Sequence, residues 1–191
     1  MKEQVEDKRK ALMEAALKLF TERGFHGTST AQISKEAGVA TGTLFNYFPT
    51  KEDLINGLYF EIKGQLSRSI GKEIQVQSSF QDKLRKMWYN LIEWGLDNRD
   101  EFLFVGQFCS SPYITNYTRE IVMKEYVFLH ELVKEGIAGG EIRNYSGELV
   151  IAMFYQSSRT VVNFILDSEP EDRIKVIEDG FRIIWDGLAS E

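Results

Sequence analysis

The chain has 191 residues, 43% of them hydrophobic and 13% aromatic, which is enough for a packed core in one large or two small domains. A net charge of −6 argues against a protein that binds nucleic acid over its whole surface. One cysteine, Cys109, excludes an internal disulfide, and two histidines, His26 and His130, leave no clustered Cys/His spacing for a metal ion, so we expect no metal and no cofactor.

The first predicted helix covers residues 6–23. Leu12, Leu19 and Phe20 recur at the spacing of one apolar stripe on a helix. Gly24 is expected to end it. Met1 is followed by charged residues rather than an apolar signal segment, and no unbroken apolar run reaches the ~18 residues of a membrane span, so we expect a cytoplasmic protein.

A second, short helix is predicted to start after Ser29. Ser29 and Gln32 have the spacing of a capping box, in which each side chain binds a backbone N–H group of the other residue. Gly38 stands where a helix end favours a left-handed residue.

A third helix is predicted over residues 41–48, directly after that turn. Leu44 and Phe48 lie four apart and are expected to face inward, and Pro49 prevents continuation. Two short helices joined by a glycine turn form a helix-turn-helix motif at residues 29–48.

These residues resemble the TetR (tetracycline-repressor-like) family of transcriptional regulators. The resemblance rests on Ala37-Gly38-Val39, Gly42-Thr43-Leu44, Tyr47-Phe48 and Lys51-Glu52-Asp53-Leu54. It implies a repressor that binds a palindromic, double-stranded DNA operator as a homodimer and leaves it when a small-molecule effector binds the C-terminal domain.

In a helix-turn-helix the second helix enters the major groove, and its outward side chains meet base edges. Asn46 could form a bidentate pair with adenine, while Phe45 or the methyl group of Thr43 could touch thymine methyl groups. Hydroxyl, amide and ammonium groups around the motif could hold phosphates. The predicted DNA-binding residues are Ser29, Thr30, Gln32, Thr41, Gly42, Thr43, Phe45, Asn46, Tyr47 and Lys51.

The charge distribution agrees with this placement. Residues 1–51 carry eight basic and six acidic residues, a net charge of +2, so the remaining residues carry −8. We therefore expect DNA to meet the N-terminal end of the chain.

The rest of the chain also reads as helical, which predicts an all-α protein of about nine helices. Capping pairs are expected at Thr50 and Asp53, at Ser79 and Asp82, and at Ser168 and Glu171, while Ser146 is expected to cap alone. One of the remaining predicted helices runs from Lys51 to about Ile70, and another begins after Ser79. The others cover residues 99–109, 114–138, 146–166 and 168–188. We expect a DNA-binding domain over residues 1–50 and an effector-binding and dimerisation domain over residues 51–191.

Aromatic and polar side chains in the C-terminal domain are candidates to line an effector cavity between helices. Arg159 stands out because it is a charge within an otherwise apolar helix. The candidates are Trp88, Phe102, Phe108, Tyr113, Tyr126, His130, Phe154, Gln156, Arg159 and Asn163.

The last two predicted helices carry small residues beside large apolar ones, which favours a dimer interface. Two glycines seven apart in the last helix suggest that another backbone approaches there, either from a second subunit or from the same one. The residues expected to meet their symmetry mates are Phe154, Val161, Gly180, Phe181 and Trp185.

Two alternatives stay open at the level of the sequence. Glu131 and Glu135 lie four apart on one helix face, as carboxylates in an enzyme could, but neither has a histidine at Glu-x-x-His spacing, so we expect no enzyme. The other alternative is a helix-turn-helix regulator that a protein partner controls and that has no small-molecule pocket.

Overall fold

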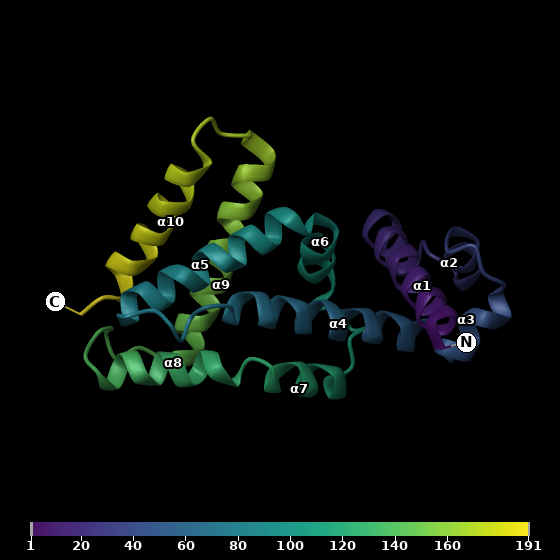
Figure 1. The fold of residues 1–191 in the computed structure, drawn as a ribbon, viewed down its shortest axis with the longest axis horizontal. Coiled ribbons are helices and arrows are strands. Elements are labelled where there is room, and N and C mark those ends of the chain that lie inside the picture. Colours follow the sequence, from purple (N-terminus) through teal and green to yellow (C-terminus); the bar gives the residue numbers. More distant parts are fainter. Residues whose placement is uncertain (1, 191) are drawn as a thin grey trace. The chain divides into compact units, whose positions relative to one another are not determined.

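The computed structural model describes residues 2–190, and over this range it is all-helical, with ten helices (Figure 1). The helices are α1 (Lys2–Arg23), α2 (Thr30–Glu36), α3 (Thr41–Tyr47), α4 (Lys51–Gly71), α5 (Phe80–Asp97), α6 (Arg99–Phe108), α7 (Asn116–Lys124), α8 (Val127–Ala138), α9 (Gly147–Ser168) and α10 (Arg173–Leu188). The predicted all-α class is confirmed.

The helix predicted over residues 114–138 is in fact two helices, α7 and α8. The chain leaves helical geometry at Tyr126, where ψ is 9°, and the hydroxyl of Ser67 donates to the carbonyl oxygen of Glu125 at 2.7 Å. A side chain from α4 therefore satisfies a carbonyl group at the break. Apolar residues continue through it, so hydrophobic spacing alone gave no sign of an interruption.

The chain forms two compact units. The first comprises residues 1–64 and 99–122, and the second comprises residues 65–98 and 123–191, so that α4 contributes residues to both. The expected boundary after residue 50 separates DNA binding from effector binding and dimerisation, not two packed units. It stays a prediction.

In the first unit, α2 and α3 pack against α1 (Figure 1). Leu12, Phe20, Ile33 and Leu44 are fully buried and come from all three helices. Phe108 of α6 joins this core, with its ring centroid 6.2 Å from that of Phe20. The three N-terminal helices are therefore completed by a segment about 80 residues further along the chain.

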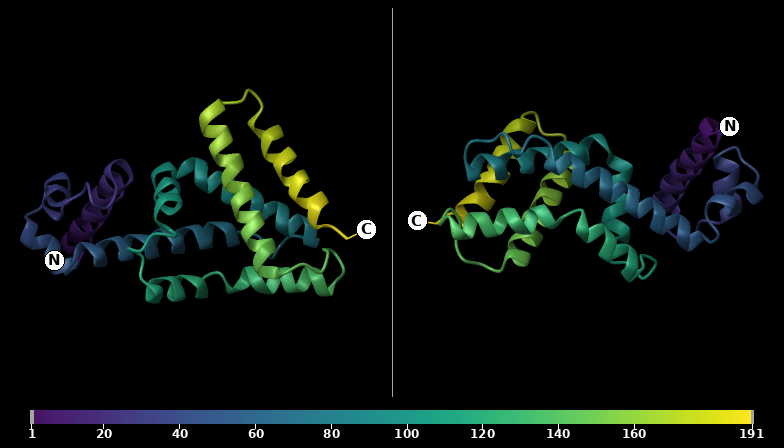
Figure 2. Two further views of the ribbon diagram at one scale, coloured as in Figure 1. Left: turned by 180° about the vertical axis from the view of Figure 1, so that it is seen from behind. Right: turned by 60° about the horizontal axis from the view of Figure 1, so that its bottom comes forward.

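In the second unit, α9 packs against α5, α8 and α10, and α9 and α10 lie side by side in all views (Figures 1 and 2). The centre is Trp88 of α5, which is fully buried and donates its indole N–H to the carbonyl oxygen of Ile177 at 2.9 Å. The rings of Phe154 and Phe181 pack edge-on to it at 5.4 and 6.3 Å.

Three predicted helix starts are confirmed by hydrogen bonds. Ser29 and Gln32 form the capping box of α2, Thr50 and Asp53 form the same exchange at α4, and Ser79 accepts from the backbone N–H of Asp82 at α5. All three pairs combine a hydroxyl with an amide or carboxylate three residues on.

One predicted start is wrong, and one predicted cap lacks its hydrogen bond. α9 begins directly after Ser146, as predicted, but the Ser146 side chain makes no capping hydrogen bond. Ser168 with Glu171 does not start the last helix: α9 continues through Ser168, Glu169 adopts a left-handed conformation, and α10 begins only after Asp172, whose carboxylate accepts from the N–H of Lys175. Ser168 and Glu171 have the spacing of a capping pair, with Pro170 between them, but this signal was false. Asp172, the next residue, is an equally good cap and is the one that starts α10.

By length and composition, α9 is the one helix in the described part of the chain that could cross a membrane. Its apolar residues pack on three other helices of the second unit, as they do in a soluble helical bundle. One of its faces nevertheless remains apolar and exposed, as described below.

Candidate nucleic-acid interface

Two hydroxyl groups hold the turn before α2, one of them buried and the other at the N-cap of the helix. Thr28 is almost fully buried, and its hydroxyl lies 2.9 Å from the carbonyl oxygens of both Leu19 and Gly24. Next to it, Ser29 accepts from the N–H of Gln32 at 3.2 Å, while the Gln32 side chain accepts from the N–H of Ser29 at 2.8 Å. The first turn of α2 therefore has a fixed position relative to α1.

Gly38 lies in the link between the two short helices and has a φ of +68°, the left-handed conformation that its position in the sequence predicts. The N–H of Val39 then donates to the carbonyl oxygen of Ser34 at 2.9 Å, which closes the turn. Side chains other than glycine rarely adopt this conformation, so the angle between α2 and α3 depends on this residue.

α3 is anchored by its inner face. Leu44 is fully buried and Phe48 is nearly so, as predicted. The opposite face carries exposed residues, among them Thr41, Asn46 and Phe45, whose side chain is 46% exposed. An exposed phenylalanine beside polar groups on a short, well-anchored helix is suited to contact base edges and thymine methyl groups.

Lys51 is engaged inside the first unit. Its ammonium group donates to the carbonyl oxygens of Phe25 and Thr28 at 2.9 and 3.0 Å and lies 3.9 Å from the centre of the Phe25 ring. An ammonium group has three N–H donors, so a phosphate contact would use the one left over. Lys51 therefore ties the start of α4 to the turn before α2, a role that sequence reasoning missed.

Two ion pairs brace the same helices. Lys18 of α1 lies 2.5 Å from the carboxylate of Glu36 in α2, and Arg9 of α1 pairs with Glu61 of α4. The hydrogen bond and the charge of Glu36 raise the pKa of Lys18, and the same contact lowers the pKa of Glu36. Both groups of this pair are solvated, so the pair contributes little to stability.

Nine of the ten predicted DNA-binding residues lie on α2 or α3 or, in the case of Ser29, at the N-cap of α2, and Lys51 is the first residue of α4. Ser29, Gln32, Thr41, Gly42, Phe45 and Asn46 are exposed, and Thr30, Thr43, Tyr47 and Lys51 are half-buried. Their participation in DNA binding stays a prediction.

The ten predicted effector-binding residues divide between the two units. Phe102, Phe108 and Tyr113 belong to the first and the other seven to the second. Gln156 and Asn163 are exposed on α9, and the guanidinium of Arg159 lies 6.0 Å from the centre of the Tyr155 ring. Trp88 and Phe154 form the aromatic core of the second unit, so their burial is explained by packing.

The first unit contains a group of polar side chains that sequence reasoning did not select. On α4, burial lowers the pKa of Lys63 to about 8, an effect that the Cys109 thiol opposes. One turn earlier, burial raises the pKa of the Tyr59 hydroxyl, with a further rise from Cys109. Arg119 of α7 donates to the carbonyl oxygens of Cys109 and Ser111. The sequence signal that could have indicated this group is Lys63, a charged residue in a helical stretch rich in apolar residues.

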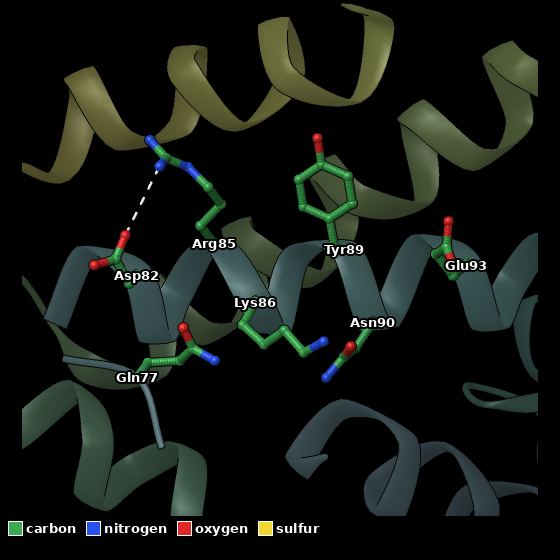
Figure 3. A pocket seen from close by; sticks show the side chains of 7 residues that line it. All are labelled: Gln77, Asp82, Arg85, Lys86, Tyr89, Asn90 and Glu93. Atoms are coloured by element: carbon green, nitrogen blue, oxygen red, sulfur yellow. Dashed lines mark ion pairs between the residues drawn. The ribbon is translucent and has the colours of Figure 1, made fainter. Parts of the chain in front are cut away.

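The exposed side of α5 carries a polar surface hollow of about 340 Å³, shown in Figure 3. Its charged groups pair locally: Lys86 lies 2.9 Å from Glu73, and Tyr89 donates to Glu178 of α10 at 2.8 Å, which together with burial raises the pKa of Tyr89 to about 12. The lining residues are Gln77, Asp82, Arg85, Lys86, Tyr89, Asn90 and Glu93. These contacts fix α5 against its neighbours.

The close approach predicted at Gly180 exists within the subunit. A Cβ atom there would lie 2.8 Å from Val161 of α9 and 2.9 Å from the Trp88 ring of α5. Phe154 and Phe181 are buried in the same place, and Trp185 stacks on Phe181 at 6.3 Å. Of the two explanations for this glycine, approach of its own subunit therefore accounts for it. Contact of these residues with a second copy stays a prediction.

An apolar stripe on α9 points away from the second unit. Leu149, Met153 and Phe164 are each more than half exposed and lie on one face of the helix. On α10, Ile183 is 73% exposed. Hydrophobic spacing could not separate these outward residues from the inward ones, because α9 is apolar on more than one face.

Comparison with known proteins places this geometry in context. Residues 12–58 match the family described as "Bacterial regulatory proteins, tetR family", and residues 59–189 match the "Tetracyclin repressor-like, C-terminal domain". The crystal structure of a TetR family transcription regulator from Shewanella sp. PV-4 is 31% identical, with a TM-score of 0.88, and the alignment covers 96% of this chain and 99% of that one.

Similarity to Bacillus subtilis regulators of fatty acid metabolism is found in sequence and to FadR in structure. The fatty acid metabolism regulator protein is 24% identical over 185 residues, covering 94% of this chain and 95% of its own length. The structure of the transcriptional regulator FadR in complex with stearoyl-CoA is 22% identical, with a TM-score of 0.77 and coverage of 93% and 98%.

Proposed function

The chain belongs to the TetR family of bacterial transcriptional regulators, which are not enzymes, and from that premise we propose that it is a repressor that a small molecule releases from a palindromic operator. The observation that carries the DNA-binding part is the exposed face of α3, anchored from behind by Leu44 and Phe48. We place the protein in the cytoplasm, where its DNA is.

The repressor acts as a homodimer in this proposal, with α9 and α10 of each subunit forming the interface. The three exposed apolar residues Leu149, Met153 and Phe164 on one face of α9 support this, because a second copy that packed on them would remove their apolar surface from water. An isologous dimer would give the two α3 helices the two-fold symmetry of a palindrome.

The proposed effector is a long-chain acyl thioester of coenzyme A. FadR of Bacillus subtilis, which shares the fold, has been crystallised with stearoyl-CoA. In this chain Lys63 is a cation held where burial disfavours its charge, and an anionic group beside it would favour that charge again.

Release follows from differential binding. An effector can shift the protein away from DNA only by as much as it prefers the conformation that does not bind the operator, and ~1 to 3 kcal/mol is the usual scale of such coupling. By reciprocity, operator DNA must weaken effector binding by the same factor.

The proposal is tested by titrating stearoyl-CoA into the complex of the full chain with an operator selected from random DNA. We expect release of DNA at micromolar stearoyl-CoA, measured by fluorescence anisotropy, and no release with coenzyme A or with stearate at the same concentration. If the protein binds its selected operator and none of the three changes the affinity, the acyl-CoA assignment is wrong.

That outcome would favour the alternative in which a protein partner controls the regulator. Native mass spectrometry of the purified dimer distinguishes the two cases, because a ligand-gated protein retains mass from a bound molecule or takes up added acyl-CoA.

A further inference from the structure

The segment between α6 and α7 lies against the turn between α1 and α2, within the first unit. The ring of Tyr113 stacks on that of Phe25 with centroids 4.0 Å apart and an angle of 15° between the planes. The Tyr113 hydroxyl lies 2.6 Å from Nε2 of His26. Two consecutive residues of the turn therefore contact one tyrosine from the segment after α6.

Phe25 occupies the centre of the turn. Its ring also stacks on that of Phe20 at 5.8 Å, meets the His26 ring edge-on at 5.7 Å, and lies beside the ammonium of Lys51, which donates to the Phe25 carbonyl oxygen. Thr28 and the cap residue Ser29 follow within four residues, so a shift of Phe25 would move the start of α2.

Tyr113 itself is held by side chains from α4 and α7. The carboxamide of Asn56 donates to the Tyr113 carbonyl oxygen at 2.8 Å and accepts from the N–H of Thr115 at 2.9 Å. Arg119 donates to the carbonyl oxygens of Cys109 and Ser111. These hydrogen bonds give residues 109–115 a fixed conformation. A movement of this segment would therefore move Tyr113 and, with it, the turn before α2.

We propose that Tyr113 is a positioning residue for DNA reading: through Phe25 and His26 it fixes the turn before α2, and so the orientation of α2 and α3, from outside the helix-turn-helix. The inference needs only the DNA-binding function that the family has, and not the proposed effector. A change in the conformation of residues 109–115 would reach the reading helices through this contact.

The two parts of the contact can be separated by mutation. Tyr113→Phe keeps the stacking on Phe25 and removes the hydrogen bond to His26, whereas Tyr113→Ala removes both. A single hydrogen bond contributes about 0.5 to 1.5 kcal/mol, which corresponds to a change of roughly 2- to 13-fold in an equilibrium constant. If Tyr113 only filled the core, Tyr113→Phe would be neutral for DNA binding.

The experiment measures the affinity of the full chain for a selected operator by fluorescence anisotropy, with unfolding midpoints recorded in parallel. We expect about 3- to 10-fold weaker binding for Tyr113→Phe, at temperatures where the variant is fully folded, and a larger loss for Tyr113→Ala. In a double-mutant cycle, the losses from Tyr113→Phe and His26→Ala should be less than additive, because both remove the same hydrogen bond, while His26→Ala alone also removes ring contacts at 5.7 Å to Phe25 and 5.4 Å to Tyr113.

The matched control is Tyr117→Phe, because Tyr117 lies on α7 in the same unit and is 72% exposed. It should bind the operator as the unmodified chain does. Operator affinity unchanged in Tyr113→Phe, additive losses in the cycle, or an equal loss in Tyr117→Phe would overturn the inference. If Tyr113→Ala does not fold, Tyr113→Phe and the cycle decide alone.

Discussion

Gly42 is the second residue of α3, and nothing in the subunit requires a glycine there. Apart from its chain neighbours and the backbone of α3 itself, a Cβ atom at this position would have no heavy atom within 4 Å, and the backbone is helical. Glycine inside a helix is about 1 kcal/mol less favourable than alanine. The open space is therefore available to DNA, which can approach the backbone of α3 most closely at a residue without a side chain.

We predict that Gly42→Ala stabilises the free protein by roughly 0.5 to 1 kcal/mol and weakens operator binding. Urea unfolding and anisotropy titration measure the two effects. Gly38→Ala is the matched comparison, since Gly38 also has open space but a φ of +68°, so the substitution should lower stability instead. A Gly42→Ala protein with unchanged operator affinity would remove this residue from the interface.

Lys63 makes stability depend on pH in a defined direction. Its pKa in the folded protein, about 8, is below the ordinary value of 10.5, so between these values the unfolded chain binds more protons. The destabilisation is fully present below pH 8, and the free energy of unfolding rises as the pH goes from 8 to 10.5.

We therefore predict that Lys63→Met is more stable than the unmodified chain at pH 7, by about 1 to 3 kcal/mol, and that the advantage shrinks towards pH 10. Urea unfolding at pH 7, 8, 9 and 10 measures it, with Lys124→Met as the control at an exposed position of α7. An advantage that stayed constant with pH, or appeared equally in Lys124→Met, would contradict the burial of this charge.

The packing of α9 and α10 explains the glycine at position 180, which the sequence alone left open. Gly180 sits against Val161 and Trp88 of its own subunit, so Gly180→Leu is expected to destabilise the second unit itself, by about 1 to 3 kcal/mol for such overpacking. Loss of a dimer in that variant would be a consequence of damaged packing, and the substitution is a poor probe of assembly.

Phe164 is the better probe. It is 53% exposed on the α9 stripe, so Phe164→Lys should leave the subunit folded. We predict a shift from dimer to monomer at micromolar concentration by sedimentation, with weaker operator binding as a result. Val76→Lys is the control, since Val76 is exposed in the link between α4 and α5. A Phe164→Lys protein that sediments as the unmodified chain does would exclude this face as the interface.

Local signals in the sequence predicted the elements that depend on local chemistry. The capping boxes at Ser29 and Thr50 and the left-handed Gly38 were predictable because a few neighbouring residues determine them. The break at Tyr126 and the start of α10 at Asp172 were not, because tertiary contacts and competing caps decide them.

At the scale of the whole molecule, sequence identified the fold and the family but could not say which apolar residues of α9 face inward or outward. Nor could it show that Tyr113 contacts His26, 87 residues away in the chain, because a contact at that separation depends on the path of the backbone. The effector-binding residues were the hardest to predict, because aromatic side chains are equally common in a packed core and in the lining of a cavity.

In the proposed function, the outer face of α3 in each subunit of a symmetric dimer reads one half of a palindromic operator. Selection of binding sites from random DNA by the full chain, repeated with Asn46→Ala and Lys51→Ala, tests it most directly. We predict a palindromic motif for the unmodified chain, loss of preference at one position in each half-site for Asn46→Ala, and uniformly weaker binding of the same motif for Lys51→Ala. No palindromic motif, or an Asn46→Ala profile identical to that of the unmodified chain, would contradict the account.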